Sequence, residues 1–77
     1  MNTRTFETKS YGTLNRPDRT YEGELSEGVP HGEGKEYFKG QKIYEGNFVN
    51  GDREGYGEEY YEGKLFYQGN FKKGKKN

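Results

Sequence analysis

A 23-residue repeat is the feature that most constrains how this chain can fold. Residues 21–43 and 44–66 match position for position, and a third, partial copy covers residues 67–77. Each copy opens with a tyrosine. Units repeated at such a period bury their apolar faces against neighbouring units rather than in a separate core. The sequence therefore predicts a stack of similar units within one domain.

The opening segment of each copy alternates strictly between two kinds of residue. From Tyr21 to Leu25, large apolar residues and glycine alternate with glutamate, and after Tyr44 and Tyr67 they alternate with glutamate, glutamine or asparagine. Alternation with a period of two is typical of a half-buried strand. The glycine between two large side chains leaves room for a neighbouring ring or backbone to approach. We therefore expect replacement of Gly46 by Val to destabilise the fold.

Glycine-rich and aromatic segments follow this strand in each full copy. Glycine permits tight reversals of the chain, so we expect residues 26–34 and 49–57 to form loops. The aromatic segments 35–39 and 58–62 are then the returning strands of two hairpins. Each copy is predicted to be one β-hairpin.

The length of the hairpin tips decides which side chains share a face. A tip of two or four residues places Tyr37 with Tyr44 and Tyr60 with Tyr67. The opposite face then carries a second set of apolar residues, called here the apolar stripe: Phe38, Ile43, Tyr61 and Phe66. Either a strongly twisted sheet partly covers both faces, or the stripe is a groove for a partner, because contiguous exposed aromatic residues mark interfaces.

Residues 1–20 lie outside the clear repeats. We predict that residues 5–16 form a degenerate strand that caps the stack, since repeat arrays need atypical ends. Pro17 and Asp18 supply the turn, because proline fixes φ and aspartate tolerates the next turn position. The chain then divides into a capping segment and the repeat region that starts at Tyr21.

The repeated residues resemble the MORN (membrane occupation and recognition nexus) repeat. In the first copy the resemblance rests on the Tyr-Glu-Gly opening, Leu25 and three spaced glycines, and the second copy repeats it with Phe48. The second half of each copy is similar to the variant form found in bacterial and protist proteins. This resemblance implies one hairpin per unit and a binding or scaffolding role, with no catalytic residues to carry over.

Composition leaves disorder as the alternative to a folded sheet. Only 26% of the residues are hydrophobic, a content at which disorder is common. The net charge is zero, however, and the aromatic residues recur at fixed positions, which a disordered chain does not need. The chain has no cysteine, so aromatic packing must supply the stability. We predict an all-β protein, a single twisted antiparallel meander of about six short strands.

Nothing in the sequence predicts an enzyme. His31 is the only histidine and is expected to be a turn residue, because a catalytic or metal site needs several converging groups. Glu58 and Glu59 are adjacent strand residues that point to opposite faces, so they cannot act as an acid pair. With Glu62 they are expected to form a solvated strand. We therefore predict no catalytic residue, no metal and no cofactor.

Protein binding or scaffolding is the function that the sequence favours. The candidate binding residues are Phe38, Ile43, Tyr61, Phe66 and Phe71. The strand that starts at Tyr67 has no returning strand in the sequence, so its edge could pair with a partner's strand or with itself in a twofold dimer. A small inhibitor or immunity-type protein is a further alternative.

A membrane-surface module that binds phosphoinositides is the other alternative. It would use the four lysines of the C-terminal tail, Lys72, Lys73, Lys75 and Lys76, which could contact anionic lipid headgroups. Nucleic acid is not an expected partner. The sequence contains no apolar segment of signal-peptide or membrane-spanning length, and we expect a cytoplasmic protein.

Overall fold

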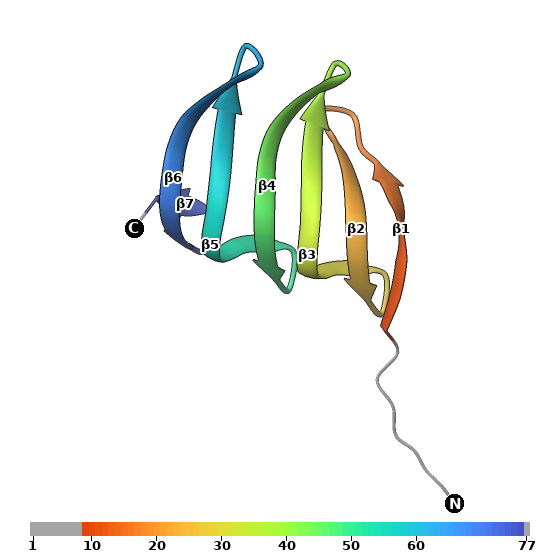
Figure 1. Cartoon of the computed structure of the whole chain (residues 1–77). Helices are drawn as coiled ribbons and strands as arrows, with labels where there is room; N and C mark the ends of the chain where they lie inside the picture. Colours follow the sequence, from red (N-terminus) through yellow and green to blue (C-terminus); the bar gives the residue numbers. More distant parts are fainter. Residues whose placement is uncertain (1–8, 77) are drawn as a thin grey trace, which may run out of the picture.

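Seven antiparallel strands form a single open sheet in which each strand pairs with its neighbours in the sequence (Figure 1). The computed structural model describes residues 9–76. The strands are β1 (Lys9–Asn15), β2 (Thr20–Ser26), β3 (Val29–Phe38), β4 (Gln41–Val49), β5 (Asp52–Tyr61), β6 (Lys64–Lys72) and β7 (Lys75–Lys76). The predicted all-β meander is confirmed, with seven strands instead of about six. No helix long and apolar enough to cross a membrane occurs among the described residues.

Two-residue turns ending in glycine join the strands from β2 onward. In the turn at Asn50 and Gly51, both residues have positive φ, at 51° and 91°. This is the geometry of a type I′ turn, whose twist matches that of the flanking strands. The expectation that residues 26–34 and 49–57 are loops is therefore wrong. Only two residues of each segment form a turn, and most of the rest begins β3 or β5.

A row of glycines crosses the sheet from β1 to β6. Its members, each paired with the next, are Gly12, Gly23, Gly34, Gly46, Gly57 and Gly69. A Cβ atom added to Gly46 would lie 2.5 Å from the Cα of Gly57, and one added to Gly57 would overlap the ring of Tyr44. The close approach predicted at the glycines of the opening strands is confirmed at Gly23 and Gly46. The row gives the tyrosine rings the space in which they pack.

Bulges near the hairpin tips change the pairing that we predicted. Tyr44 pairs with Glu36, whereas Tyr37 pairs with Lys42, because Ile43 is an extra residue in β4. The next hairpin repeats this arrangement, and Tyr67 pairs with Glu59 instead of Tyr60. The predicted tyrosine pairs are therefore wrong. A bulge inserts one residue and exchanges the faces beyond it, an effect that tip length alone does not reveal.

The core is a single line of aromatic rings on one face. The buried apolar residues are Tyr21, Leu25, Tyr44, Phe48 and Phe71. Each phenylalanine packs edge-on against two tyrosines, so that the Phe48 ring lies 4.9 Å from Tyr21 and 5.2 Å from Tyr44 between centroids. Phe71 continues the line between Tyr44 and Tyr67. T-shaped contacts of this kind add about 0.5–1.5 kcal/mol each to the burial of area.

The hydroxyl groups of the core tyrosines bind to backbone carbonyls of their own strand. Tyr44 donates a hydrogen bond of 3.1 Å to the carbonyl of Asn47, and Tyr21 donates one of 2.6 Å to the carbonyl of Glu24. The register of the strand shifts at both carbonyl positions. The carbonyl at each bulge thus accepts a hydrogen bond from a tyrosine hydroxyl. The hydroxyl group of the buried tyrosine in turn has a hydrogen-bond partner.

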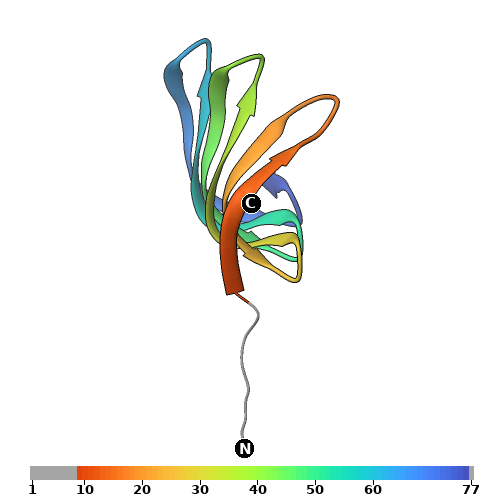
Figure 2. The same ribbon diagram turned by 90° about the vertical axis from the view of Figure 1, so that its right-hand side faces the viewer.

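The sheet is curved, and its two faces differ. Seen from the side, the lower turns and β7 bend over one face (Figure 2). We call this the concave face; it carries Tyr44, Glu36 and Arg53. The neighbouring pair Lys35 and Glu45 lies on the opposite, convex face. β1 forms the N-terminal edge. Residues 5–8 of the predicted capping strand lie outside the described residues, and the division of the chain at residue 20 remains a prediction.

Candidate functional site

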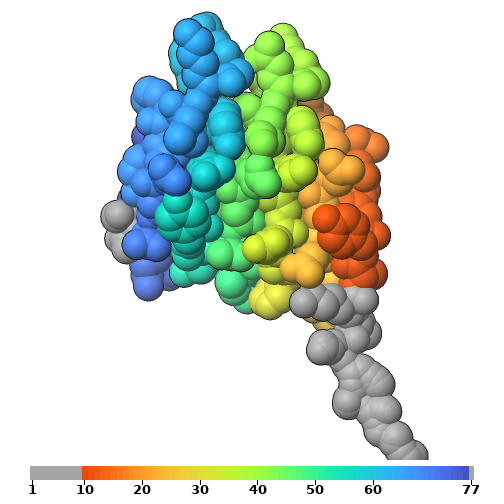
Figure 3. All heavy atoms as spheres, viewed as in Figure 1, coloured from red at the N-terminus to blue at the C-terminus, as the bar shows by residue number. Residues whose placement is uncertain are grey.

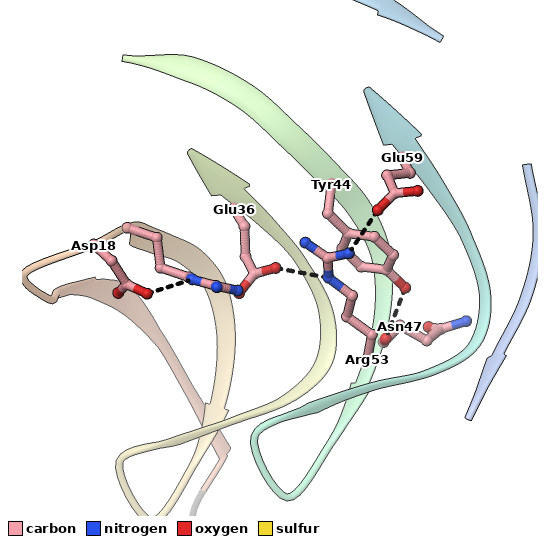
Figure 4. A network of polar contacts seen from close by, with 7 residues as sticks. Asp18, Glu36, Tyr44, Asn47, Arg53 and Glu59 are labelled. Atoms are coloured by element: carbon pink, nitrogen blue, oxygen red, sulfur yellow. Dashed lines mark hydrogen bonds and ion pairs between the residues drawn. The ribbon is translucent and has the colours of Figure 1, made fainter. Parts of the chain in front are cut away.

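Alternating charges cross the concave face as a ladder, which is defined by Arg19, Glu36, Arg53, Glu59 and Lys76. Figure 4 shows its central part, Glu36, Arg53 and Glu59. Arg53 is its centre. The Arg53 Nε donates to Glu36 Oε1 at 2.9 Å, and a second guanidinium nitrogen donates to Glu59 Oε2 at 3.3 Å. At the two ends, Arg19 lies 3.2 Å from Glu36 Oε2 and Lys76 lies 3.3 Å from Glu59 Oε1.

The repeat itself positions this charge ladder. Glu36 and Glu59 occupy the same place in successive copies, 23 residues apart, and so do Arg53 and Lys76. Each carboxylate pairs with the cation of the following copy, 17 residues further along the chain. The first copy has Pro30 at the cation position, and Arg19 from the β1–β2 connection supplies the charge instead. The ladder therefore ties one copy to the next.

Arg53 also packs on the aromatic core. Its guanidinium carbon lies 4.5 Å from the Tyr44 ring centroid and 5.8 Å from that of Phe71. The side chain is 13% exposed, and the side chain of Glu36 is 10% exposed. Burial raises the pKa of Tyr44 to about 12, although the nearby charge of Arg53 lowers it in part. These charges are mutually satisfied, so the arrangement offers no obvious general acid or base.

Glu59 is part of this ladder rather than of a solvated strand. Its side chain is 25% exposed. Its Oε1 atom is buried, accepts no hydrogen bond within the described residues, and is held by the ion pair with Lys76. Glu58 lies on the other face, where Tyr60 donates a hydrogen bond to it at 2.8 Å. The opposite orientation of the two glutamates is as predicted, but the solvated role is wrong for Glu59.

The convex face carries a more exposed lysine that makes the same two kinds of contact, an ion pair and a cation–π contact. Lys42 Nζ lies 2.6 Å from Glu45 Oε1 and 4.5 Å from the Tyr60 ring centroid. The hydrogen bond with Glu45 raises the pKa of Lys42, and that with Lys42 lowers the pKa of Glu45. The Lys42 side chain is 32% exposed. This ion pair resembles the contacts of Arg53 without their burial.

The apolar stripe lies at the base of the hairpin tips, on the side of the charge ladder and of Tyr44, so its predicted place on the opposite face is wrong. Figure 3 shows these two tips standing apart, in green for β3–β4 and in blue for β5–β6. Ile43, Tyr61 and Phe66 line a shallow hollow of about 260 Å³ together with Arg53 and Lys76. The structure therefore brings three stripe residues together. The fourth, Phe38, lines a neighbouring hollow beside the β1–β2 connection.

Two stripe residues are well exposed and contact each other. Tyr61 is 65% exposed and Phe66 is 64% exposed, and their ring centroids lie 6.0 Å apart. Lys76 covers one side of the Phe66 ring at 4.8 Å. Phe71, the fifth candidate binding residue, is only 3% exposed and belongs to the core. Strand alternation turns Phe71 toward Tyr44 and Tyr67, and its inclusion in a binding surface stays a prediction.

The lysines of the tail have different environments. Lys75 and Lys76 form β7, which pairs with the end of β6, so this part of the tail is a strand and not a frayed end. Lys76 belongs to the charge ladder. Lys72, Lys73 and Lys75 surround the β6–β7 turn and are exposed.

His31 links the first copy of the repeat to the second through a hydrogen bond. It lies in β3 just after the turn, where its Nδ1 accepts a hydrogen bond of 3.3 Å from the backbone N–H of Asn50. Glu54, at the same place in the next copy, accepts the backbone N–H of Lys73 at 3.0 Å. His31 is thus a structural acceptor beside a turn. Residues 9–76 contain no group of three or more His, Asp or Glu side chains that could hold a metal ion.

Residues 9–76 thus form a stacked β-hairpin repeat protein. The family model of the MORN repeat matches residues 21–41, 44–64 and 67–77, which is more than half of the chain. The chain therefore belongs to the MORN repeat family, as its sequence suggested. Proteins with this repeat commonly bind protein partners or membranes. Neither the curated proteins nor the solved structures gave a match.

Proposed function

We propose that this chain is a non-catalytic protein-binding module, and that Ile43, Tyr61 and Phe66 of the apolar stripe form the centre of its binding surface. The observation that carries this proposal is the contact between two highly exposed aromatic rings beside the charge ladder. An apolar centre surrounded by charged groups is the usual anatomy of a protein interface. Aromatic and arginine side chains also supply most of the binding energy at such sites.

The surroundings of the stripe support a peptide or loop as the bound element. The hollow beside Tyr61 and Phe66 is shallow and open, so it suits an inserted side chain better than an enclosed small molecule. Its charged lining residues, Arg53, Glu59 and Lys76, are paired with one another. A partner segment that inserts an apolar side chain between Tyr61 and Phe66 would match this hollow.

A capture experiment tests this proposal. The tagged protein is incubated with native lysate, and the captured partner is compared with that of Phe66→Asp and of a matched control, Tyr11→Asp. Tyr11 is 75% exposed on β1, away from the stripe. We expect Phe66→Asp to lose the partner and Tyr11→Asp to retain it. Equal retention by both variants would exclude the stripe.

Membrane binding is a second candidate because three exposed lysines surround one turn. Lys72 and Lys75 are directly opposite each other in the β6–β7 pair, with Lys73 between them in the turn. Each could add on the order of 1 kcal/mol near an anionic surface. Sedimentation with phosphatidylserine vesicles tests this function, and changing the three lysines to Gln should abolish any binding. Vesicle binding that survives this change would remove the lysines from the mechanism.

A further inference from the structure

The turn between β4 and β5 carries a chemically reactive pair of residues. Asn50 is the only asparagine of the chain that precedes a glycine, whereas Asn47 and Asn70 precede phenylalanine. The backbone nitrogen that follows an asparagine can attack the side-chain amide, and glycine permits this because it has no Cβ atom to block the approach. The same place in the other two copies holds Glu27 and Lys73, which have no amide to lose. The sequence therefore singles out Asn50 for deamidation.

This reaction exchanges ammonia for water. The Gly51 nitrogen forms a bond to Cγ of Asn50, and the bond between Cγ and the side-chain nitrogen breaks. A proton from the Gly51 nitrogen passes through solvent to the departing nitrogen, which leaves as ammonia. Water then opens the five-membered succinimide to aspartate or isoaspartate. Both products carry a new negative charge, and in isoaspartate the main chain is one methylene longer.

The native turn keeps the two reacting groups apart. Asn50 has a φ of 51° and Gly51 a φ of 91°, as in a type I′ turn. In such a turn the first central residue has a ψ of about +30°, which directs the next backbone nitrogen away from that residue's own side chain. Ring closure therefore requires rotation about the Cα–C bond of Asn50, and this rotation opens the turn.

The preceding copy of the repeat holds the turn in this conformation. The Gly51 N–H donates a hydrogen bond of 2.8 Å to the carbonyl of Pro30, and the Asn50 N–H donates one of 3.3 Å to His31 Nδ1. The first of these bonds engages the nitrogen that must attack. Asn50 itself is exposed, so water reaches its side chain. The contact between the first and second copies thus opposes the reaction, whereas burial does not.

We propose that Asn50 is a site of spontaneous deamidation that the contact between copies holds in check. Separation of the turn from Pro30 and His31 frees the Gly51 nitrogen, and ring closure then competes with return of the turn. Local openings have their own free energies, which differ from that of global unfolding. The rate of modification at Asn50 therefore measures how often the first and second copies separate at their turns.

The isoaspartate product makes the separation permanent. A two-residue type I′ turn matches the twist and fixes the register of its two strands. An additional methylene in the main chain does not fit that register, so the modified turn cannot restore both hydrogen bonds to Pro30 and His31. The modification is independent of partner binding, because these residues lie at the lower turns and not in the apolar stripe.

Rates of deamidation test this proposal. The full chain is incubated at mildly alkaline pH in buffer and in guanidinium chloride, and peptide mapping by mass spectrometry follows Asn50, with Asn47 and Asn70 as internal controls. We expect Asn50 to react at least about tenfold more slowly in the folded chain than in guanidinium chloride. The two controls should react slowly in both solutions. Equal rates for Asn50 in the two solutions would overturn the proposal.

The variant His31→Ala tests whether the neighbouring copy supplies the protection. Loss of one hydrogen bond weakens the contact, so Asn50 should react about two- to tenfold faster in the folded variant than in the natural protein. Lys42→Met removes an ion pair from the convex face and is the control for a small loss of stability elsewhere; it should leave the rate unchanged. A rate in His31→Ala at or below the natural one, or an equal increase in both variants, would overturn the proposal.

The isolated product gives an independent result. Chromatography separates the isoaspartate form, and its urea midpoint is compared with that of Asn50→Asp, which introduces the charge without the additional methylene. We expect the isoaspartate form to unfold at a lower urea concentration than Asn50→Asp and to exchange the Gly51 amide hydrogen faster. Equal midpoints and equal exchange would show that the product keeps the contact, and would overturn the proposed permanent separation.

Discussion

Replacement of Arg53 by methionine should destabilise the protein more than any other single change in the charge ladder. The change removes the hydrogen bonds to Glu36 and Glu59 and the stacking on Tyr44. Loss of one partner from a largely buried ion pair costs about 3–5 kcal/mol, and the cation–π contact adds about 0.5–2 kcal/mol. Arg19 and Lys76 still neutralise the two carboxylates, so we expect a loss of about 3 kcal/mol.

This loss is large for a chain of 77 residues. At roughly 0.05–0.15 kcal/mol per residue, its total stability is about 4–12 kcal/mol. With an m-value of about 1 kcal/mol/M, the urea midpoint of Arg53→Met should fall by about 3 M. Near-ultraviolet circular dichroism follows the transition through the tyrosine rings.

Lys42→Met is the matched control for this experiment. Lys42 makes the same kinds of contact, an ion pair with Glu45 and a cation–π contact at 4.5 Å with Tyr60. It is more exposed than Arg53, and an exposed ion pair contributes only about 0–1 kcal/mol. We expect its midpoint to fall by less than about 1 M. Equal midpoints for the two variants would refute the view that burial of the ladder stabilises the stack.

Three further predictions concern the core and the turns. Gly57→Val should reduce stability by more than about 3 kcal/mol or prevent folding, since its side chain would enter the Tyr44 ring, and thermal denaturation measures this. Burial raises the pKa of Tyr21 and of Tyr44 to about 12. The unfolded tyrosines ionise first, so stability should fall from pH 10 to 12 by on the order of 1–2 kcal/mol for each ring; a flat urea midpoint over this range would contradict the burial argument. His31→Ala should leave the Asn50 N–H without its side-chain acceptor, cost about 1 kcal/mol and speed amide hydrogen exchange at that turn.

The general architecture follows from the sequence because it depends on periodic features. The 23-residue period and the alternation after Tyr21 and Tyr44 are local, and they predict hairpins and a meander that the structure confirms. The glycine between two large residues in each opening strand is also a local feature, and it predicted the close approach of a neighbouring ring or backbone. The assignment of residues 26–34 to a loop failed because glycine content does not distinguish a turn from a strand whose glycines make room for rings.

The face of the sheet to which each side chain points could not be predicted in the same way. A bulge at Ile43 exchanges the face beyond it, and nothing in the local sequence marks that position. The charge ladder was missed because its partners lie 17 residues apart, on different strands. A signal for it was nevertheless present, since Glu36 and Glu59 align in successive copies, as do Arg53 and Lys76. Opposite charges at fixed repeat positions predict contacts between copies once the register is known.

Site-specific photo-crosslinking tests the proposed binding surface most directly. A photoreactive phenylalanine analogue at position 66 lies within the apolar stripe, whereas the same analogue at position 11 lies on β1, outside it. In native lysate, position 66 should give a discrete crosslinked protein band that excess unlabelled protein removes, and position 11 should not give this band. The same band from both positions, or a band from position 11 alone, would contradict the assignment of the apolar stripe as the partner-binding surface.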